Sequence, residues 1–358
     1  MISLTIYPYN RTSDPLIDYI SSENTLPIKI KYAVPLKGWL GDGTQATENN
    51  DITVTYNIKC AIDSSDALCV VETWIKLDFK VFIVPVIRCA LQRGKYVYFA
   101  RELTSEESDM LSELTKCSGQ LVLPEHVIPS LGHFIQLDTP VLAVGGYSEG
   151  IDKHAIQLRL TKRFREYHLN VLLIASNPCV SLWGDHFVPS FMFSNTLSEN
   201  DKVRAFNSYV ANLESRYNPD IIILGIPGAI VSNDPESLMD FGIISYEIAL
   251  AARPDDMILV SPYGSYQEQY YPLVEKLVSQ RLGVHIIRHH ISKYAYDLSM
   301  LREMSFKSPV LVDEAAINKI VSESHHDTVA NLYSDDELDN LCRCFIAKYG
   351  SYSEIGAL

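Results

Sequence analysis

Residues 140–158 read PVLAVGGYSEGIDKHAIQL, an apolar strand followed by a glycine-rich loop and the start of an amphipathic helix. Glycine lacks the Cβ that would block close approach of the backbone, and a helix start adds partial positive charge. Loops of this kind bind phosphate through backbone N–H groups that point inward. The stretch therefore predicts a phosphate-binding loop over Gly145–Lys153, and a polyphosphate is the first ligand to consider.

The loop departs from the usual phosphate-binding pattern around its lysine. The usual spacing puts Lys and then Ser or Thr directly after the second glycine, whereas Ile151 and Asp152 follow Gly150, and His154 follows Lys153. The hydroxyl ligand for Mg²⁺ is therefore missing from its usual place. The alternative is a close strand-to-helix turn with no ligand and a solvated lysine. The loop residues that we expect to contact phosphate are Gly145, Gly146, Ser148, Gly150, Asp152 and Lys153.

A second glycine turn is expected at the same edge of the sheet. Residues 221–228 read IIILGIPG, which resembles the strand that ends in Asp-x-Pro-Gly in P-loop nucleotidases of the signal-recognition and MinD type. In those proteins the carboxylate holds Mg²⁺ through water and helps to neutralise the phosphoryl group, but here Gly225 stands in its place. We therefore add Gly225 and Gly228 to the predicted site, with ATP or GTP and Mg²⁺ as candidate ligands. Binding without efficient turnover is favoured over hydrolysis.

The segment Leu182–Phe193 follows the next predicted strand and is dense in aromatic residues. Related nucleotidases carry a switch-like loop here, with groups that reach the γ-phosphate. A histidine titrates near about pH 6.5 and can act as acid, base or hydrogen-bond donor. Asp185 and His186 are therefore the candidate catalytic pair, and a packing role is the alternative for the aromatic residues.

The first part of the chain alternates short apolar runs with helical patterns, which implies a parallel sheet covered on both faces. The strand candidates are Ile2–Tyr7, Ile28–Val34, Ala67–Val71 and Tyr96–Ala100. We predict a Rossmann-like domain over residues 1–135. The loop after its first strand carries no glycine, so the domain lacks the usual dinucleotide-binding signature.

Prolines and a glycine between Leu121 and Asp138 indicate a connection to a second domain. Residues 139–300 are predicted to form a second doubly wound parallel sheet, P-loop NTPase-like in type. Its strand candidates are Val141–Val144, Val171–Ala175, Ile221–Leu224, Met257–Val260 and Val284–Ile287. Residues 301–358 are predicted to be a helical tail that docks a partner or covers the domain. Its helices are expected over Val312–Glu323 and Asp335–Tyr349, the second opened by a capping box of Ser334 and Glu337.

Composition excludes several classes of partner. The formal net charge of −14 argues against nucleic acid, which needs a basic surface. No apolar run approaches the roughly 20 residues that cross a bilayer, and residues 1–5 do not resemble a signal peptide, so we expect a cytoplasmic protein without membrane contact. The seven cysteines form no C-x-x-C pair, and the paired histidines at 289–290 and 325–326 adjoin no further ligand motif. No metal site is predicted from them.

Several short motifs, in this order along roughly residues 1–300, resemble a clostridial family of peptide maturation system proteins. They are Ile6-Tyr7-Pro8-Tyr9, Val34 to Trp39, Asp152-Lys153 through Gln157-Leu158, Phe191-Met192-Phe193, Asn218-Pro219-Asp220 and Gly225 to Gly228. Proteins of this family are encoded beside ribosomally made peptides that radical enzymes modify. The resemblance implies a precursor peptide or a peptide-modifying enzyme as partner. It supplies no catalytic residues, and the oligomeric state stays open.

Three functions follow from these observations. The first is an accessory protein that binds a nucleotide, through the glycine loop and Lys153, during maturation of a ribosomally synthesised peptide. The second is a non-catalytic scaffold that binds the precursor peptide or a partner enzyme and carries a vestigial phosphate loop. The third is an ATP-dependent transfer enzyme acting on the peptide, in which Asp185, His186 or Glu72 transfers protons.

Overall fold

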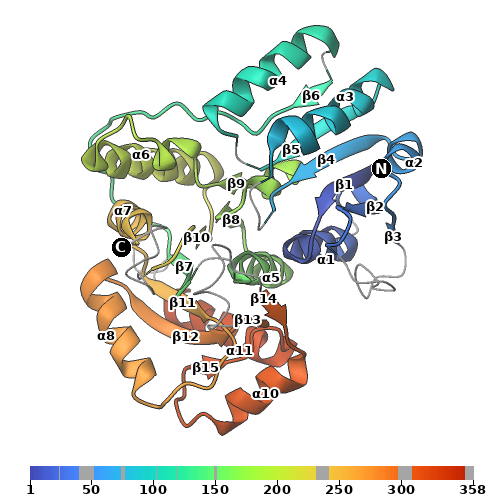
Figure 1. Ribbon diagram of the computed structural model, residues 1–358. Coiled ribbons are helices and arrows are strands. Elements are labelled where there is room, and N and C mark those ends of the chain that lie inside the picture. Colours follow the sequence, from blue (N-terminus) through green and yellow to red (C-terminus); the bar gives the residue numbers. More distant parts are fainter. Residues whose placement is uncertain are drawn as a thin grey trace. The chain divides into compact units, whose positions relative to one another are not determined.

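The computed structural model describes residues 1–23, 25–39, 52–73, 77–101, 103–118, 120–148, 151–230, 242–296 and 309–350. The chain forms two compact units, which Figure 1 colours along the sequence. The first unit contains residues 1–125 and 177–185, and the second contains residues 126–176 and 186–358. Each unit is built on a parallel sheet with helices, which confirms the predicted fold class.

The first unit has a six-stranded parallel sheet in the order β3-β2-β1-β4-β5-β6. This is the strand order of Rossmann sheets. The strands are β1 (Ile2–Tyr9), β2 (Ile28–Pro35), β3 (Thr53–Val54), β4 (Ala67–Val71), β5 (Tyr96–Ala100) and β6 (Leu121–Val122). The four predicted strands are confirmed as β1, β2, β4 and β5. The two central strands, β1 and β4, are buried along almost their whole length because a parallel sheet is covered on both faces.

The helices of this unit follow the strands in the expected alternation. They are η1 (Arg11–Ser13), α1 (Asp14–Ser22), α2 (Ile58–Asp63), η2 (Phe79–Ile83), α3 (Val84–Gln92) and α4 (Ser105–Ser118). The helical segment between β4 and β5 begins in the π-helical turn η2 and continues through α3. Its inner face includes Phe79, Ile83 and Ile87, which are buried in the core of the unit.

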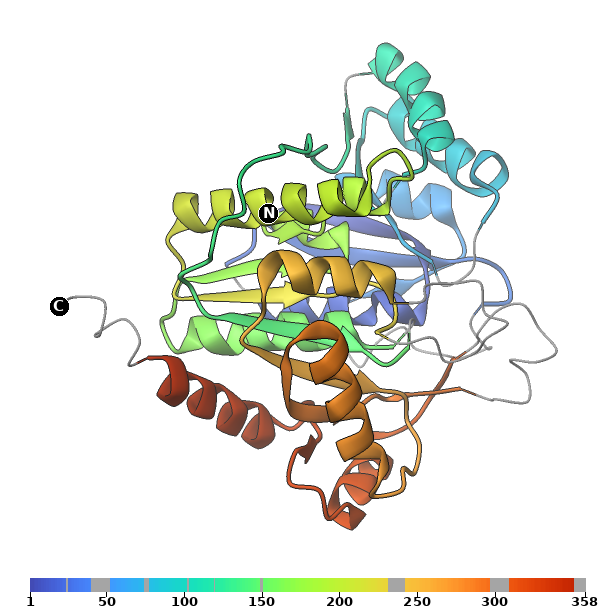
Figure 2. The same ribbon diagram turned by 90° about the vertical axis from the view of Figure 1, so that its left-hand side faces the viewer.

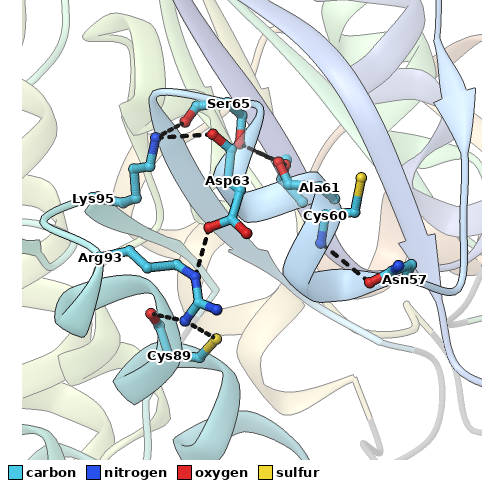
Figure 3. A network of polar contacts seen from close by, with 9 residues as sticks. Asn57, Cys60, Ala61, Asp63, Ser65, Cys89, Arg93 and Lys95 are labelled. Atoms are coloured by element: carbon cyan, nitrogen blue, oxygen red, sulfur yellow. Dashed lines mark hydrogen bonds and ion pairs between the residues drawn. The ribbon is translucent and has the colours of Figure 1, made fainter.

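A polar network fixes the turns that precede β4 and β5 (Figure 3). The ammonium of Lys95 donates to the carbonyl of Ser65 at 2.7 Å. The guanidinium of Arg93 donates to the Asp63 carboxylate at 2.6 Å and to the carbonyl of Cys89 at 3.2 Å. The end of α2 is thereby joined to the end of α3. Because the Arg93–Asp63 pair is largely exposed, we expect it to contribute little to the stability of the unit.

Residues 177–185 return to the first unit from between two strands of the second. They form the helix η3 (Pro178–Trp183), which packs against β5. The ring of Trp183 lies 5.0 Å from that of Tyr19 on α1. Burial, with Cys69 and Glu72 nearby, raises the pKa of the Cys179 thiol. The order of elements along the sequence gives no sign of this excursion, because a loop between two strands normally stays with its own sheet.

The second unit has a seven-stranded parallel sheet in the order β15-β12-β11-β7-β10-β8-β9. The strands are β7 (Val141–Gly146), β8 (Val171–Ala175), β9 (His186–Phe187), β10 (Ile221–Gly225), β11 (Asp256–Ser261), β12 (His285–Ile291) and β15 (Val329–Ala330). The five predicted strands are confirmed as β7, β8, β10, β11 and β12. The short edge strands β9 and β15 were not predicted, because two residues carry too little periodicity to be recognised.

Helices cover both faces of this sheet. The helices are α5 (Lys153–Glu166), η4 (Ser190–Phe193), α6 (Glu199–Tyr217), α7 (Ile243–Ala252), α8 (Tyr270–Leu282), α10 (Glu314–Glu323) and α11 (Asp335–Tyr349). Figure 2 shows α6, α7 and α8 side by side over one face, and α5 and α11 pack together on the other. A separate antiparallel pair joins β13 (Tyr294–Tyr296) to β14 (Pro309–Leu311).

The C-terminal region covers the second unit. Both predicted tail helices are present as α10 and α11, and β15 adds a strand to the sheet. Ser334 is the N-cap of α11, but its side chain makes no capping hydrogen bond, so the predicted capping box is wrong. Side chains along α11 attach it instead: the Tyr167 hydroxyl donates to Asp339 at 2.6 Å, and the Lys348 ammonium donates to the buried Asp256 carboxylate at 2.7 Å.

Candidate phosphate-binding site

The glycine loop lies where an open parallel sheet usually binds its ligand. From β7 the chain crosses to β8 and the edge strand β9, returns to β10 beside β7, and then continues through β11, β12 and β15 on the other side. The strand order therefore reverses at β7. Ligands of such sheets bind at the carboxyl ends of the strands beside this point, and residues 147–152 follow the carboxyl end of β7 directly.

The two glycines at the end of β7 are needed for close packing. A Cβ on Gly145 would lie 2.4 Å from the Met257 methyl carbon and 2.7 Å from Ile230 Cδ1. A Cβ on Gly146 would lie 2.6 Å from the Cδ of Lys153. Gly145 thus lets β7 pack against its neighbours, and Gly146 makes room for the stem of Lys153.

Lys153 is the buried cation of the site. It is the first residue of α5 and is only 6% exposed. Its ammonium donates a hydrogen bond to the carbonyl oxygen of Gly228, in the turn after β10. Gly228 has a φ of 72°, a conformation that favours glycine. The structure therefore brings Lys153, Gly146 and Gly228 together across the neighbouring strands β7 and β10.

The backbone amides of the loop converge less than the sequence suggests. The N–H of Tyr147 donates to the carbonyl of Val260 on β11 at 2.8 Å, and the N–H of Lys153 donates to the carbonyl of Ile151 at 2.9 Å. These two donors are satisfied within the protein. Ser148 is 4% exposed, and its hydroxyl has no hydrogen-bond partner among the described residues. Gly150 was also predicted to bind phosphate and lies outside the described residues.

Asp152 is turned toward the C-terminal region. Its carboxylate accepts from the Tyr333 hydroxyl and from the backbone N–H of Lys293 at 3.1 Å, and it lies 3.9 Å from His290 Nε2. Burial alone would raise the pKa of Asp152, but the polar groups of His290, Tyr333 and Ser292 beside the carboxylate hold it below its ordinary value. The carboxylate is therefore ionised at neutral pH, and the structure does not place it as a phosphate contact.

Gly225 cannot be replaced by the carboxylate found at the matching position of P-loop nucleotidases without a clash. A Cβ at this position would lie 2.4 Å from Gln157 Oε1 and 2.4 Å from the backbone nitrogen of Ser176. The Gln157 side chain is fully buried and accepts from the Ser176 N–H at 3.0 Å. A glutamine on α5 therefore fills the space that a magnesium-holding carboxylate would need.

The two residues of the predicted catalytic pair belong to different units. The Asp185 carboxylate accepts from the indole N–H of Trp183 at 2.7 Å, within the first unit. His186 begins the edge strand β9, and its ring lies 5.1 Å from that of Tyr217. Since β9 is the third strand from β7, at about 4.8 Å per strand the separation is roughly 14 Å. The structure does not bring His186 to the phosphate loop.

Four residues around the site were not predicted from the sequence: Gln157, His290, Lys293 and Tyr333. Gln157 could have been noticed, because it is a polar residue four positions after Lys153 on the buried side of the helix. The other three approach Asp152 from positions far along the chain, and no local pattern marks them. Among the described residues, no group of three His, Cys, Asp or Glu side chains has a geometry that holds a metal ion. In the same part of the chain, no helix has the length and apolar character to cross a membrane.

These features define a two-unit parallel α/β protein with a Rossmann-like sheet and a second, P-loop-like sheet. No family model matches the sequence, and no curated protein sequence matches it. A solved structure of a DUF1611 family protein from Anabaena variabilis is similar, with a TM-score of 0.65 over 97% of this chain and 100% of that one, at 13% identity. At this identity the likeness shows a shared fold over the whole chain.

Two further solved structures match less well. Cobyrinic acid a,c-diamide synthase from Mycobacterium smegmatis, with bound ADP and magnesium, gives a TM-score of 0.35 at 11% identity, over 60% of this chain and 96% of that one. Chloroplast FtsY from Physcomitrella patens gives a TM-score of 0.27 at 14% identity, over 46% of this chain and 53% of that one. Similarity at this level says nothing about the ligands of this chain. A ligand can therefore be inferred only from the site itself.

Proposed function

We propose that this protein binds a nucleotide or another polyphosphate at the carboxyl end of β7, with Lys153 as the principal cation. The observation that carries the proposal is the burial of this lysine beside the glycine turn of Gly228. Lysine is almost never fully buried unless it is paired, and an ammonium group carries three donors. Its bond to the Gly228 carbonyl oxygen places this charge in the turn after β10, where a phosphate group at the carboxyl end of β7 would meet it.

Two further features support an anionic ligand. The helix α5 begins at Lys153, so the partial positive charge of its N-terminus adds to that of the ammonium. The buried hydroxyl of Ser148 lacks a partner among the described residues, and buried polar groups are usually satisfied. A phosphate oxygen would accept from this hydroxyl.

Binding without efficient turnover is the form of this function that the site supports best. Phosphoryl transfer needs Mg²⁺ and a carboxylate that positions it, and Gln157 fills the space at Gly225 where that carboxylate would stand. We expect purified protein with ATP or GTP and Mg²⁺ to release phosphate at no more than the uncatalysed rate, measured by a phosphate assay. A turnover that exceeds the rate of a Lys153→Met variant would contradict this part of the proposal.

The partner class comes from the sequence resemblance alone. It supports a role in maturation of a ribosomally synthesised peptide, in which the partner is a precursor peptide or a peptide-modifying enzyme. A nucleotide-binding accessory protein should bind such a partner differently with and without nucleotide, whereas a scaffold with a vestigial loop should not. Titrating the partner peptide in the presence and absence of ATP separates the two. The transfer-enzyme alternative would require a change in peptide mass.

Titration of ATP, GTP and inorganic triphosphate tests the binding proposal directly. We expect Lys153→Met to weaken binding about 10- to 100-fold, because a charged hydrogen bond to a ligand contributes about 1.5–3 kcal/mol. Methionine keeps the apolar stem that packs on Gly146 and removes only the charge. Calorimetry on both proteins gives the two affinities.

Lys276→Met is the matched control for this titration. Lys276 is an exposed lysine on α8 of the same unit, so its removal changes the net charge equally. Its affinity should equal that of the wild type. Absence of binding by the wild-type protein to all three ligands would end the proposal, and equal losses in both variants would show that only net charge matters.

A further inference from the structure

Asp152 occupies the N-cap position of α5 without capping the helix. An aspartate at this position normally accepts from backbone N–H groups in the first turn, but the Asp152 side chain makes no such bond. Its carboxylate bonds instead to the Tyr333 hydroxyl and to the Lys293 N–H. The first turn of α5 is the part of the loop that would meet a phosphate group, so an aspartate that capped it would compete with the ligand.

The geometry around the carboxylate is built by residues far along the chain. Tyr333 follows β15, and Lys293 follows β12, so both lie at the same edge of the sheet as the loop. The N–H of Leu332 donates to His290 Nδ1 at 3.1 Å. This assigns the proton of a neutral imidazole to Nε2, which faces the Asp152 carboxylate at 3.9 Å.

The Tyr333 side chain is itself fixed on several sides. Its ring meets that of His290 edge-on at 5.2 Å, and the Lys293 ammonium lies 5.0 Å from its centre. The Arg159 guanidinium, on α5, donates to the carbonyl of Leu332 at 3.1 Å and to that of Tyr333 at 2.9 Å. The C-terminal region is therefore attached to the same helix that begins at the phosphate loop.

We propose that Tyr333 is a positioning residue for the anion site, which holds the Asp152 carboxylate away from the N-terminus of α5. This inference rests on the proposed function. When Tyr333 holds Asp152, the start of the helix is available to a phosphate group. When it releases Asp152, the carboxylate caps its own helix and adds a negative charge beside Lys153, so anion affinity falls. Tyr333, which follows β15, thereby sets the affinity for anions of a loop that lies more than a hundred residues earlier in the chain.

A double-mutant cycle tests the proposal, with ATP and inorganic triphosphate as probes. Tyr333→Phe removes the hydroxyl and keeps the ring. We expect it to weaken binding about tenfold, because the released carboxylate would both cap the helix and repel the anion. The same change in an Asp152→Ala background should have no effect, because no carboxylate remains to be released. Tyr167→Phe is the control, since it removes another tyrosine–aspartate hydrogen bond, to Asp339, at the other end of α5.

Hydrogen exchange without ligand supplies a readout that loss of structure would not mimic. In Tyr333→Phe, amides in the first turn of α5 should become more protected, because Asp152 now caps them, whereas a general loosening would lower their protection. Three outcomes would each overturn the inference and leave the proposed function standing. Tyr333→Phe could bind the probes as tightly as the wild type, or it could lose the same affinity with and without Asp152. The amides in the first turn of α5 could also become less protected. A wild-type protein that binds neither probe would remove both.

Discussion

Replacing Gly225 by alanine is expected to lower the free energy of unfolding by about 3 kcal/mol, at the upper end of the range for overpacked cores. The added Cβ would lie 2.4 Å from Gln157 Oε1 and from the Ser176 nitrogen. Real Cβ atoms do not approach so closely, and the second of these atoms belongs to the backbone at the end of β8. The hydrogen bond from the Ser176 N–H to Gln157 passes through the same space. Urea unfolding of both proteins measures the difference.

Gly264→Ala is the control for this prediction. Gly264 lies after β11 at the same edge of the sheet, and the nearest atoms to an added Cβ belong to Tyr266 at 3.8 Å, which is ordinary contact. We expect a change within about 0.5 kcal/mol. If both alanine variants lost the same stability, the cause would be the flexibility of the glycine backbone and not the close approach at Gly225.

The same contact bears on any attempt to restore a magnesium site. Gly225→Asp would create the Asp-x-Pro-Gly sequence found in P-loop nucleotidases, but its Cβ would meet the same atoms. We therefore expect it to be at least as destabilising as alanine and to give no hydrolysis. The glycine that stands at position 225 in place of aspartate is thus coupled to a second residue, Gln157, which lies one turn into α5.

The sequence predicted the fold well because the signals for it are local. Apolar runs such as Val171–Ala175 and Ile221–Leu224 are too short for helices and are bounded by turn residues, and their alternation with helices requires parallel sheets. The expectation that the glycine loop and the Gly225–Gly228 turn share one edge of the sheet follows from the rule that parallel strands end at one edge. Each of these inferences needed only neighbouring residues and the geometry of a sheet.

The surroundings of the site could not be predicted, because they depend on side chains that meet across the sheet. Nothing near Asp152 in the sequence shows that its carboxylate bonds to Tyr333, 181 residues away. The hydroxyl of Ser334 was expected to cap α11, but whether a capping side chain makes its bond depends on its tertiary contacts. His186 was taken as catalytic from its place after β8, and the strand order then put it at the edge of the sheet.

Mild acid is expected to destabilise the second unit strongly between about pH 6.5 and about pH 4. Burial lowers the pKa of His289 to about 4, although Glu275 opposes the shift and His326 adds to it. Burial also lowers the pKa of His154 to about 4, against a hydrogen bond with Gln157. Asp152 has a pKa below its ordinary value, so it titrates at lower pH than this window.

The direction follows from counting protons in the two states. An unfolded histidine titrates near about pH 6.5. Between that value and about pH 4 the unfolded chain binds protons that the folded chain does not, so falling pH favours unfolding. Each histidine can lower the free energy of unfolding by at most about 1.4 kcal/mol per pH unit in this window. Above about pH 6.5 both side chains are neutral in both states, and their contribution is fully present.

Urea unfolding at about pH 7 and about pH 5 measures how much stability each protein loses in acid. Comparing the wild type with His289→Gln and His285→Gln separates the effect of the buried histidine from other effects of acid. Glutamine keeps a donor for Glu275, which bonds to His289 Nε2 at 3.2 Å. We expect His289→Gln to lose about half as much stability between the two pH values as the wild type. His285, which is exposed on the same strand, should leave the loss unchanged when replaced. If the three proteins lost stability equally, the acid sensitivity would have to come from other groups, because His289 is the buried titrating side chain that distinguishes the two variants.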